Sequence, residues 1–330
     1  MYEKGSDSRR RTPWTDDENA TPLERFIDLC NHDNYQKKHP LVGDTYEPDL
    51  LNSYRPDFCR HCGSMEFESK GYLRSGIRQY RCRSCGRSFT IITNTIFDQR
   101  KIPITEWIDF LLSIFGHASF NLASKANRNA YNTTRYWIDK LFAQLRSWQD
   151  PIMLEGYVYL DEMFYSVREG DKATDGNGNL LRGLSRNKIC IGVGSDGRNV
   201  VCISEGFGKP SKKTTMDSFS GHIMKGSILI HDGDNSHSML IEKLGLSSDV
   251  HLTKDTKGLK DPENPLAPIN RQHKMLRRFL NSHSGFVRAD IQDYLNLFSF
   301  MSSEPHNVHE KVKILFESAL YSSNLVRYRR

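Results

Sequence analysis

The sequence has 330 residues, of which 37% are hydrophobic, and it carries a formal net charge of +6. This length predicts two or three folding units, with enough apolar side chains for one sizeable core. No run of about 18 apolar residues occurs, and the first eleven residues are polar and basic. We therefore expect neither membrane insertion nor secretion, and a cytoplasmic location.

The positive charge is unevenly distributed along the chain. It gathers at residues 9–11, 70–101, 274–278 and 327–330. Runs of charge are often only solvated surface, but this distribution fits a polyanionic partner better than an acidic small substrate. It indicates a DNA-bound protein.

The first predicted element is a short amphipathic helix within a polar segment, residues 1–55. Thr21 and Glu24 have the spacing of a capping box, and Pro22 suits the first helical position. Apolar residues then recur on one helical face, at Leu23, Phe26, Ile27 and Cys30.

Two CxxC pairs follow, separated by nineteen residues: Cys59 with Cys62, and Cys82 with Cys85. This spacing is typical of a tetrahedral thiolate site for structural zinc. Residues 71–81 between the pairs favour two short strands about a polar turn, so residues 56–100 are predicted to form a zinc ribbon. The other three cysteines have no regular spacing and indicate buried thiols in a reducing compartment.

The predicted ribbon is basic, with eight Lys or Arg against one acid between residues 70 and 101. We expect its arginines to contact DNA phosphate, and the candidates are Arg74, Arg78, Arg81, Arg83 and Arg87. The alternative is that zinc only replaces a core too small to fold by itself, because ligand spacing says nothing about a partner.

Residues 101–150 contain three predicted helices, at 104–115, 121–126 and 133–148, with Thr105 as the cap of the first. Three short helices of this kind favour a helix-turn-helix unit that binds DNA. A plain helical spacer has the same periodicity, since periodicity reports packing and not groove insertion.

Beyond residue 150 the pattern changes to strands, predicted at 157–160, 188–194 and 199–204, the last two as a hairpin. An exposed loop at 170–183 lies between the first two. Helices at 214–222 and 236–244 then alternate with strands at 227–230 and 250–252, before a long helix from Ile269. This order predicts an α/β domain, residues 151–304, with an RNase H-like mixed sheet flanked by helices. Residues 305–330 are predicted to form a helical tail.

Two carboxylates follow predicted strands, Asp161 after 157–160 and Asp232 after 228–231. Converging carboxylates hold the divalent cations used in phosphoryl transfer, here Mg²⁺ or Mn²⁺. An acid after a strand is also ordinary turn chemistry. Glu162 is expected to point to the opposite side from Asp161, and Asp234 remains a competitor of Asp232.

Together these motifs resemble those of insertion-sequence transposases of the ISXO type. The resemblance runs from about Cys59 to Phe300. It is carried by the paired CxxC motifs and, in order, by Leu160-Asp161-Glu162, His231-Asp232-Gly233 and Ile269-Asn270-Arg271-Gln272-His273.

The resemblance implies a zinc ribbon joined to a catalytic domain of the DDE type, with Asp161 and Asp232 as the first two metal ligands. Asn270 would take the third position, where His273, one turn later, competes with it. At helical spacing both lie near Lys274 and Arg277, so this helix, with Arg278, can also meet DNA phosphate; the alternative is a solvated basic helix.

The implied activity is binding of transposon ends, metal-dependent strand cleavage and strand transfer by a homo-oligomer. Two other classes remain open. A DNA-binding regulator or decayed transposase would keep the ribbon and tolerate loss of the acids. A nuclease or junction resolvase on the same fold would cut DNA without joining it.

Overall fold

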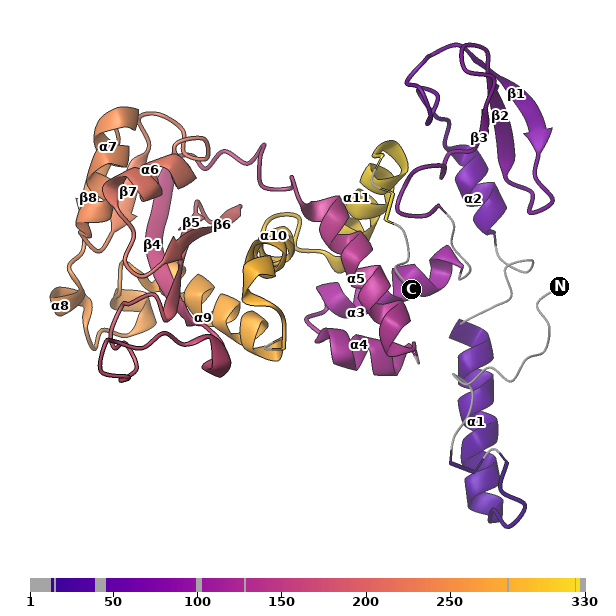
Figure 1. Ribbon diagram of the computed structural model, residues 1–330, viewed down its shortest axis with the longest axis horizontal. Helices are drawn as coiled ribbons and strands as arrows, with labels where there is room; N and C mark the ends of the chain where they lie inside the picture. The colour runs from indigo at the N-terminus through magenta and orange to yellow at the C-terminus, as the bar shows by residue number, and fades with distance from the viewer. Residues whose placement is uncertain are drawn as a thin grey trace. The chain divides into compact units, whose positions relative to one another are not determined.

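The computed structural model describes residues 13–14, 16–38, 46–98, 103–127, 129–283, 285–323 and 325–326. The basic clusters at 9–11 and 327–330 lie outside these residues. The chain forms two compact units, Met1–Gln144 with Val308–Arg330, and Leu145–Asn307 (Figure 1). Within the described part of the chain, each helix is too short or too polar to span a bilayer.

The first helix of the first unit, α1 (Pro22–Lys38), begins with the predicted capping box. The backbone N–H of Thr21 donates to Glu24 at 2.7 Å, and the backbone N–H of Glu24 donates to the Thr21 hydroxyl at 3.3 Å. The helix extends to Lys38 and is therefore longer than the short helix predicted around Leu23 to Cys30. A second helix, α2 (Glu47–Ser53), was not predicted from the sequence.

A small antiparallel sheet follows, in the order β1 (Phe67–Tyr72), β2 (Arg78–Cys82) and β3 (Ser88–Phe89). The predicted pair of strands about a polar turn is therefore confirmed, and β3 is an addition. Its core is small, formed by Cys59, Tyr80, Cys82 and Phe89 with Phe67 packed against them. A core of so few apolar side chains is the kind that a bound metal commonly stabilises.

The three predicted helices of the first unit are confirmed as α3 (Ile104–Phe115), α4 (Phe120–Ala126) and α5 (Tyr131–Leu145). The prediction that Thr105 caps α3 is wrong. The helix begins one residue earlier, and the backbone N–H of Ile104 donates to a Glu47 carboxylate oxygen at 2.9 Å, which satisfies this helix end instead.

The C-terminal helix, α11 (Val308–Tyr321), belongs to the first unit. Its Phe316 ring lies 5.2 Å from the Phe97 ring, and its Leu320 carbonyl accepts a hydrogen bond from the Arg60 guanidinium. The apolar face expected of the tail is therefore buried against the segments that surround the cysteines.

The second unit is built on a five-stranded sheet in the order β6-β5-β4-β7-β8. Its strands are β4 (Tyr157–Ser166), β5 (Lys188–Ser195), β6 (Val200–Phe207), β7 (Ile228–His231) and β8 (Ser247–Val250). The first three pair antiparallel, and β4, β7 and β8 pair parallel. This mixed sheet has the strand order of the predicted RNase H-like fold, so the predicted fold class is confirmed.

Helices cover both faces of this sheet (Figure 1). On one face, Val158 and Leu160 pack with Phe219 of α6 (Lys212–Phe219) and Leu240 of α7 (Ser238–Leu244). Side chains alternate along a strand, so Tyr165 faces the other way, where its hydroxyl meets Asn281 of α9 (Ala267–Ser282) at 3.3 Å. The helix α10 (Ile291–Ser302) packs along β6. Shorter helices are η3 (Glu169–Asp171), η4 (Asn235–His237), α8 (Thr253–Thr256), η5 (Asp261–Glu263) and η6 (Arg288–Asp290).

Close packing of α6 onto the sheet requires a glycine at position 192. A Cβ placed there would lie 2.5 Å from Cε2 of Phe219, closer than real side-chain carbons approach. Gly194 is restricted in the same way, by Leu154 at 2.9 Å. The two glycines of β5 therefore let the Phe219 ring lie directly on the strand.

Two predicted strand bounds are wrong. The strand that carries Asp161 continues to Ser166, because antiparallel pairing with β5 extends through Ser166 and Lys188. Asp161 therefore lies in the middle of a strand and not at its end. The last strand is Ser247–Val250 and not residues 250–252, since it pairs with β7 from Ile228 to His231.

Candidate active site

The parallel register of β4 and β7 brings Asp161 and Asp232 together. Tyr159 pairs with Ile230, and each aspartate comes two residues later, Asp161 still within β4 and Asp232 directly after the end of β7. Burial, followed by the negative charge of Asp232, raises the pKa of Asp161 to about 7. The side chain of Asp161 is only 22% exposed, so two acids converge where little water screens their repulsion.

Both carboxylates are oriented by local backbone N–H groups. Oδ1 of Asp161 accepts from the N–H of Glu162 at 2.8 Å, and Oδ1 of Asp232 accepts from the N–H of Asp234 at 2.9 Å. Each bond occupies one oxygen and turns the carboxylate, so Oδ2 of each acid is left for another contact.

Of the two residues considered for the third position, the structure brings His273 to Asp161. Nδ1 of His273 lies 3.7 Å from Oδ2 of Asp161, and the histidine side chain is 14% exposed. Asn270 is an exposed residue in the first turn of α9, one turn before His273. The helix therefore turns the imidazole, and not the amide, toward the carboxylates.

One ring nitrogen of His273, Nε2, is buried and makes no hydrogen bond to the described residues. Burial lowers the pKa of His273 to about 4, so the ring is neutral at physiological pH and can offer a lone pair. An unpartnered buried nitrogen costs free energy, so Nε2 is free to bind a ligand or an ordered water.

The donors at this site are of the kind that hold a divalent cation, although the ligand atoms of Asp161, Asp232 and His273 do not all lie within 4.8 Å of one another. Two converging carboxylates supply the hard, negatively charged oxygens that Mg²⁺ and Mn²⁺ prefer, and a neutral imidazole adds a donor better suited to Mn²⁺ than to Mg²⁺. A cation between Asp161 and Asp232 would also remove the repulsion that raises the Asp161 pKa.

Asp234, the competitor of Asp232, has both oxygens in use. Its Oδ2 pairs with Nζ of Lys209 at 2.8 Å, and its Oδ1 accepts the backbone N–H of Ser236 at 2.9 Å, which caps η4. Although burial acts to raise it, the pKa of Asp234 is lowered by its hydrogen bonds with Lys209 and Ser236. This acid is therefore engaged in the turn, and Asp232 is the better ligand.

A second cluster, missed by the sequence analysis, lies beside the aspartates. His237, fully buried, contacts Glu162 and His231, and the ligand atoms of His231, Asp232 and His237 lie within 4.8 Å of one another. Burial lowers the pKa of His231 to about 4, whereas Glu162 overcomes burial and raises the pKa of His237. The contact of Glu162 with η4 agrees with its predicted orientation away from Asp161.

The four cysteines of the small sheet form a second candidate metal centre. Their sulfurs lie within 4.8 Å of one another, with Cys59 and Cys85 at 3.7 Å and Cys62 and Cys82 at 3.6 Å. The backbone N–H of Arg87 lowers the pKa of Cys85 to about 6, which favours the thiolate that binds metal. Four sulfurs at this spacing, on two turns closed by Gly63 and Gly86 in the left-handed conformation, fit zinc.

The basic residues predicted to meet DNA fall into two sets. In the small sheet, Arg74, Arg81, Arg83 and Arg87 are exposed and Arg78 is half-buried. Arg78 donates to the hydroxyl of Tyr72 at 3.0 Å, and Arg83 pairs with Glu68 at 3.0 Å. In the second unit, α9 exposes Lys274, Arg277 and Arg278. The helix that turns His273 toward Asp161 therefore also carries cations on its solvent side.

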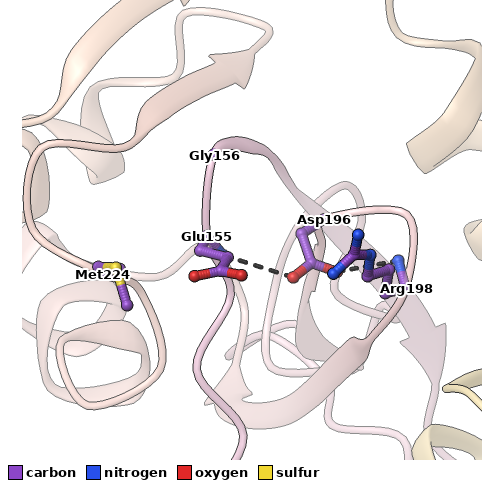
Figure 2. Close-up of a pocket in the computed structure, with 5 residues that line it drawn as sticks. All are labelled: Glu155, Gly156, Asp196, Arg198 and Met224. Atoms are coloured by element: carbon purple, nitrogen blue, oxygen red, sulfur yellow. Dashed lines mark hydrogen bonds between the residues drawn. The ribbon is translucent and has the colours of Figure 1, made fainter.

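A shallow pocket of about 430 Å³ lies elsewhere in the second unit, where β4 begins (Figure 2). Glu155, Gly156 and Met224 line it together with Asp196 and Arg198 of the β5–β6 turn. The Asp196 carboxylate accepts backbone N–H groups of that turn, from Arg198 at 2.9 Å and Asn199 at 2.8 Å. Asp196 therefore stabilises the β5–β6 turn. The pocket is lined by neither Asp161 nor Asp232.

No family model matches the chain, and no curated protein matches it. Among solved structures, it is similar to a simian T-cell lymphotropic virus intasome in complex with PP2A regulatory subunit B56 gamma, with 10% identity, 58% of this chain and 67% of that chain covered, and a TM-score of 0.29. It is also similar to a pre-cleavage Mos1 transpososome and to the Mos1 strand transfer complex, each with 10% identity, 66% and 78% coverage, and a TM-score of 0.24. These TM-scores are low, so the description of the fold rests on strand order and the site on its own residues.

Proposed function

We propose that this protein is a DNA transposase of the ISXO type, which binds the ends of a mobile element and catalyses metal-dependent strand cleavage and strand transfer. The observation that carries the proposal is an RNase H-like sheet on which Asp161 lies near enough to Asp232 to be affected by its charge and has His273 beside it. The same arrangement supports phosphoryl transfer in general, and the ribbon and basic helix support DNA as the substrate.

In this proposal Asp161 and Asp232 would hold Mg²⁺ or Mn²⁺, and His273 would be the third protein donor. A bound cation supplies Lewis acidity, which activates the attacking oxygen and stabilises the leaving oxygen of the DNA phosphodiester. The backbone N–H groups of Glu162 and Asp234 keep the two carboxylates oriented, so little reorganisation is needed when the cation binds.

The cations on α9 have a separate role in this proposal. Lys274, Arg277 and Arg278 are exposed on the helix that bears His273, and their charge would hold the phosphodiester backbone near the carboxylates. A transposase joins two element ends, so we also propose that the active form is a homo-oligomer.

The four cysteines are proposed to bind structural zinc, and the exposed arginines of the ribbon to contact phosphates of the element end. Zinc stabilises a sheet whose own core is only a few residues. The helices α3 to α5 would add contacts to the same DNA end.

The proposal is tested by strand transfer on a labelled duplex carrying the native element end, with Mg²⁺ or Mn²⁺. Wild type is compared with Asp161→Ala, Asp232→Ala and the control Asp196→Ala, whose carboxylate belongs to the β5–β6 turn. We expect joined products from wild type and the control alone. Cleavage without joining would indicate a nuclease or resolvase, and end binding without cleavage would indicate a DNA-binding regulator.

A further inference from the structure

A chain of hydrogen bonds runs behind the proposed catalytic carboxylates, through side chains that the proposed chemistry does not use. Ser236 Oγ donates to Glu162 Oε1 at 3.0 Å, and Nε2 of His237 lies 3.1 Å from the same oxygen. Nδ1 of His237 lies 2.9 Å from Nδ1 of His231, and Nε2 of His231 lies 2.8 Å from the Ser248 hydroxyl.

The protons of this chain can be assigned from its geometry. The backbone N–H of Gly233 donates to Nδ1 of His231 at 3.2 Å, so that nitrogen carries no proton. Nδ1 of His237, facing the same nitrogen, must then be the donor. Nε2 of His231 carries the ring proton and donates to Ser248. Nε2 of His237 faces a carboxylate oxygen of Glu162, which can only accept, so this nitrogen also carries a proton and His237 holds both ring protons.

These contacts argue against a metal ion on the two histidines. His231, Asp232 and His237 are close enough to share one. However, Nδ1 of His231 already accepts from two N–H groups, and both nitrogens of His237 face hydrogen-bond partners. A cation would have to displace several of these bonds, each leaving a buried polar group without a partner.

The chain of hydrogen bonds joins β4 and β7 beyond the end of their backbone pairing. Paired residues run from Tyr157 with Ile228 to Tyr159 with Ile230 and stop there. The aspartates come two residues later, so backbone pairing does not fix their separation. Glu162 directly follows Asp161, and His231 directly precedes Asp232, so the link through His237 spans the unpaired region.

We propose that Glu162, His237 and His231 are positioning residues that set the separation of Asp161 and Asp232, and with it the affinity for the divalent cation. This inference rests on the proposed function of the aspartates as metal ligands. Burying His237 completely, and Glu162 to 7% exposure, costs free energy that apolar residues would not cost. In exchange, these buried contacts fix the positions of the two aspartates, and residues that orient metal ligands in this way tune metal binding.

The test measures Mn²⁺ binding by calorimetry on the full-length protein with its zinc retained. We expect His237→Gln and Glu162→Ala to weaken Mn²⁺ binding by about 10–100-fold, the cost of losing a partner that orients a ligand. Glu162→Gln keeps an acceptor for His237 and should recover most of the affinity. The control is His222→Gln, a half-buried histidine of the same unit that bonds to the Ile152 carbonyl at 3.0 Å; it should bind as wild type does.

A second readout follows the histidine rings by NMR of ¹⁵N-histidine-labelled protein. We expect His231 as the tautomer protonated at Nε2, and a hydrogen-bonded Nε2 proton on His237 that disappears in Glu162→Ala but persists in Glu162→Gln. This readout needs no DNA, no catalysis and no substitution of His237, so it holds if His237→Gln does not fold.

The outcomes separate this inference from the proposed function. If wild type binds no Mn²⁺, or binds it equally after Asp161→Ala, both fail. If Asp161→Ala abolishes binding while folded Glu162→Ala binds as wild type does, only the positioning role fails. A His231 ring protonated at Nδ1 would also overturn the positioning role.

Discussion

Glu205→Gln is expected to stabilise the second unit at alkaline pH. Glu205 is 9% exposed on β6, its Oε1 is buried without a partner among the described residues, and burial, followed by the charge of Glu162, raises its pKa from 4.5 to about 7. At about 1.4 kcal/mol for each pKa unit, this difference means that ionisation of Glu205 lowers the free energy of unfolding by at most ~3 kcal/mol.

The sign follows from which state holds the proton. Below pH 4.5 the carboxyl is protonated in both states, and the substitution should change nothing. As pH rises toward 7, the unfolded chain releases its proton while the folded chain retains it, so wild-type stability falls and then levels off. A neutral glutamine of the same size avoids this loss above pH 7.

The assay is calorimetric unfolding at pH 4.5 and pH 8 of wild type, Glu205→Gln and the control Glu242→Gln, an exposed glutamate on α7. At pH 8, Glu205→Gln should raise the Tm of the second unit by up to roughly 12 °C, from ~2–4 °C for each kcal/mol in a unit of this size. No increase at pH 8, or an equal increase at both pH values, would refute the reasoning.

Three further predictions concern the two metal centres and the sheet. Cys85→Ser should release zinc and make the three-stranded ribbon sensitive to trypsin, measured by metal analysis and digestion; retained zinc would contradict the four-cysteine site. His273→Ala should raise the Mn²⁺ concentration for half-maximal cleavage by about 10-fold and Asn270→Ala much less, because only the histidine lies beside the carboxylates; the reverse ranking would restore Asn270. Gly192→Ala should destabilise the second unit by about 1–3 kcal/mol in urea unfolding, because its Cβ would meet an α6 ring at 2.5 Å, whereas Gly221→Ala has open space and should be better tolerated.

The order of elements in the second unit was predictable from the sequence because apolar runs and turn residues mark them locally. The hairpin is an example: strands predicted at 188–194 and 199–204 form β5 and β6, joined by a turn in which Asp196 accepts backbone N–H groups. Asp232 was also placed correctly after a strand, since β7 ends at His231.

Features that depend on distant partners were not predictable. The length of β4 past Asp161 is set by pairing with β5, and the start of β8 by pairing with β7, so local patterns misplaced both. The choice between Asn270 and His273 depends on how α9 rotates against β4. No periodicity reports that rotation, so the sequence left both residues open.

The contact between His231 and His237 was missed for a similar reason. These residues are six apart, and only the turn through Asp234 and η4 folds one ring back onto the other. The signal present in the sequence was a pair of histidines flanking a candidate ligand, which is weak without knowledge of the turn.

The most direct test of the account is an anomalous diffraction map from crystals of the protein soaked in Mn²⁺. We expect a manganese peak between Asp161 and Asp232, roughly 2.1 Å from a carboxylate oxygen of each, with His273 as the nearest imidazole. A peak bound by His231 and His237 instead, or no peak between the two aspartates, would contradict the proposed catalytic centre.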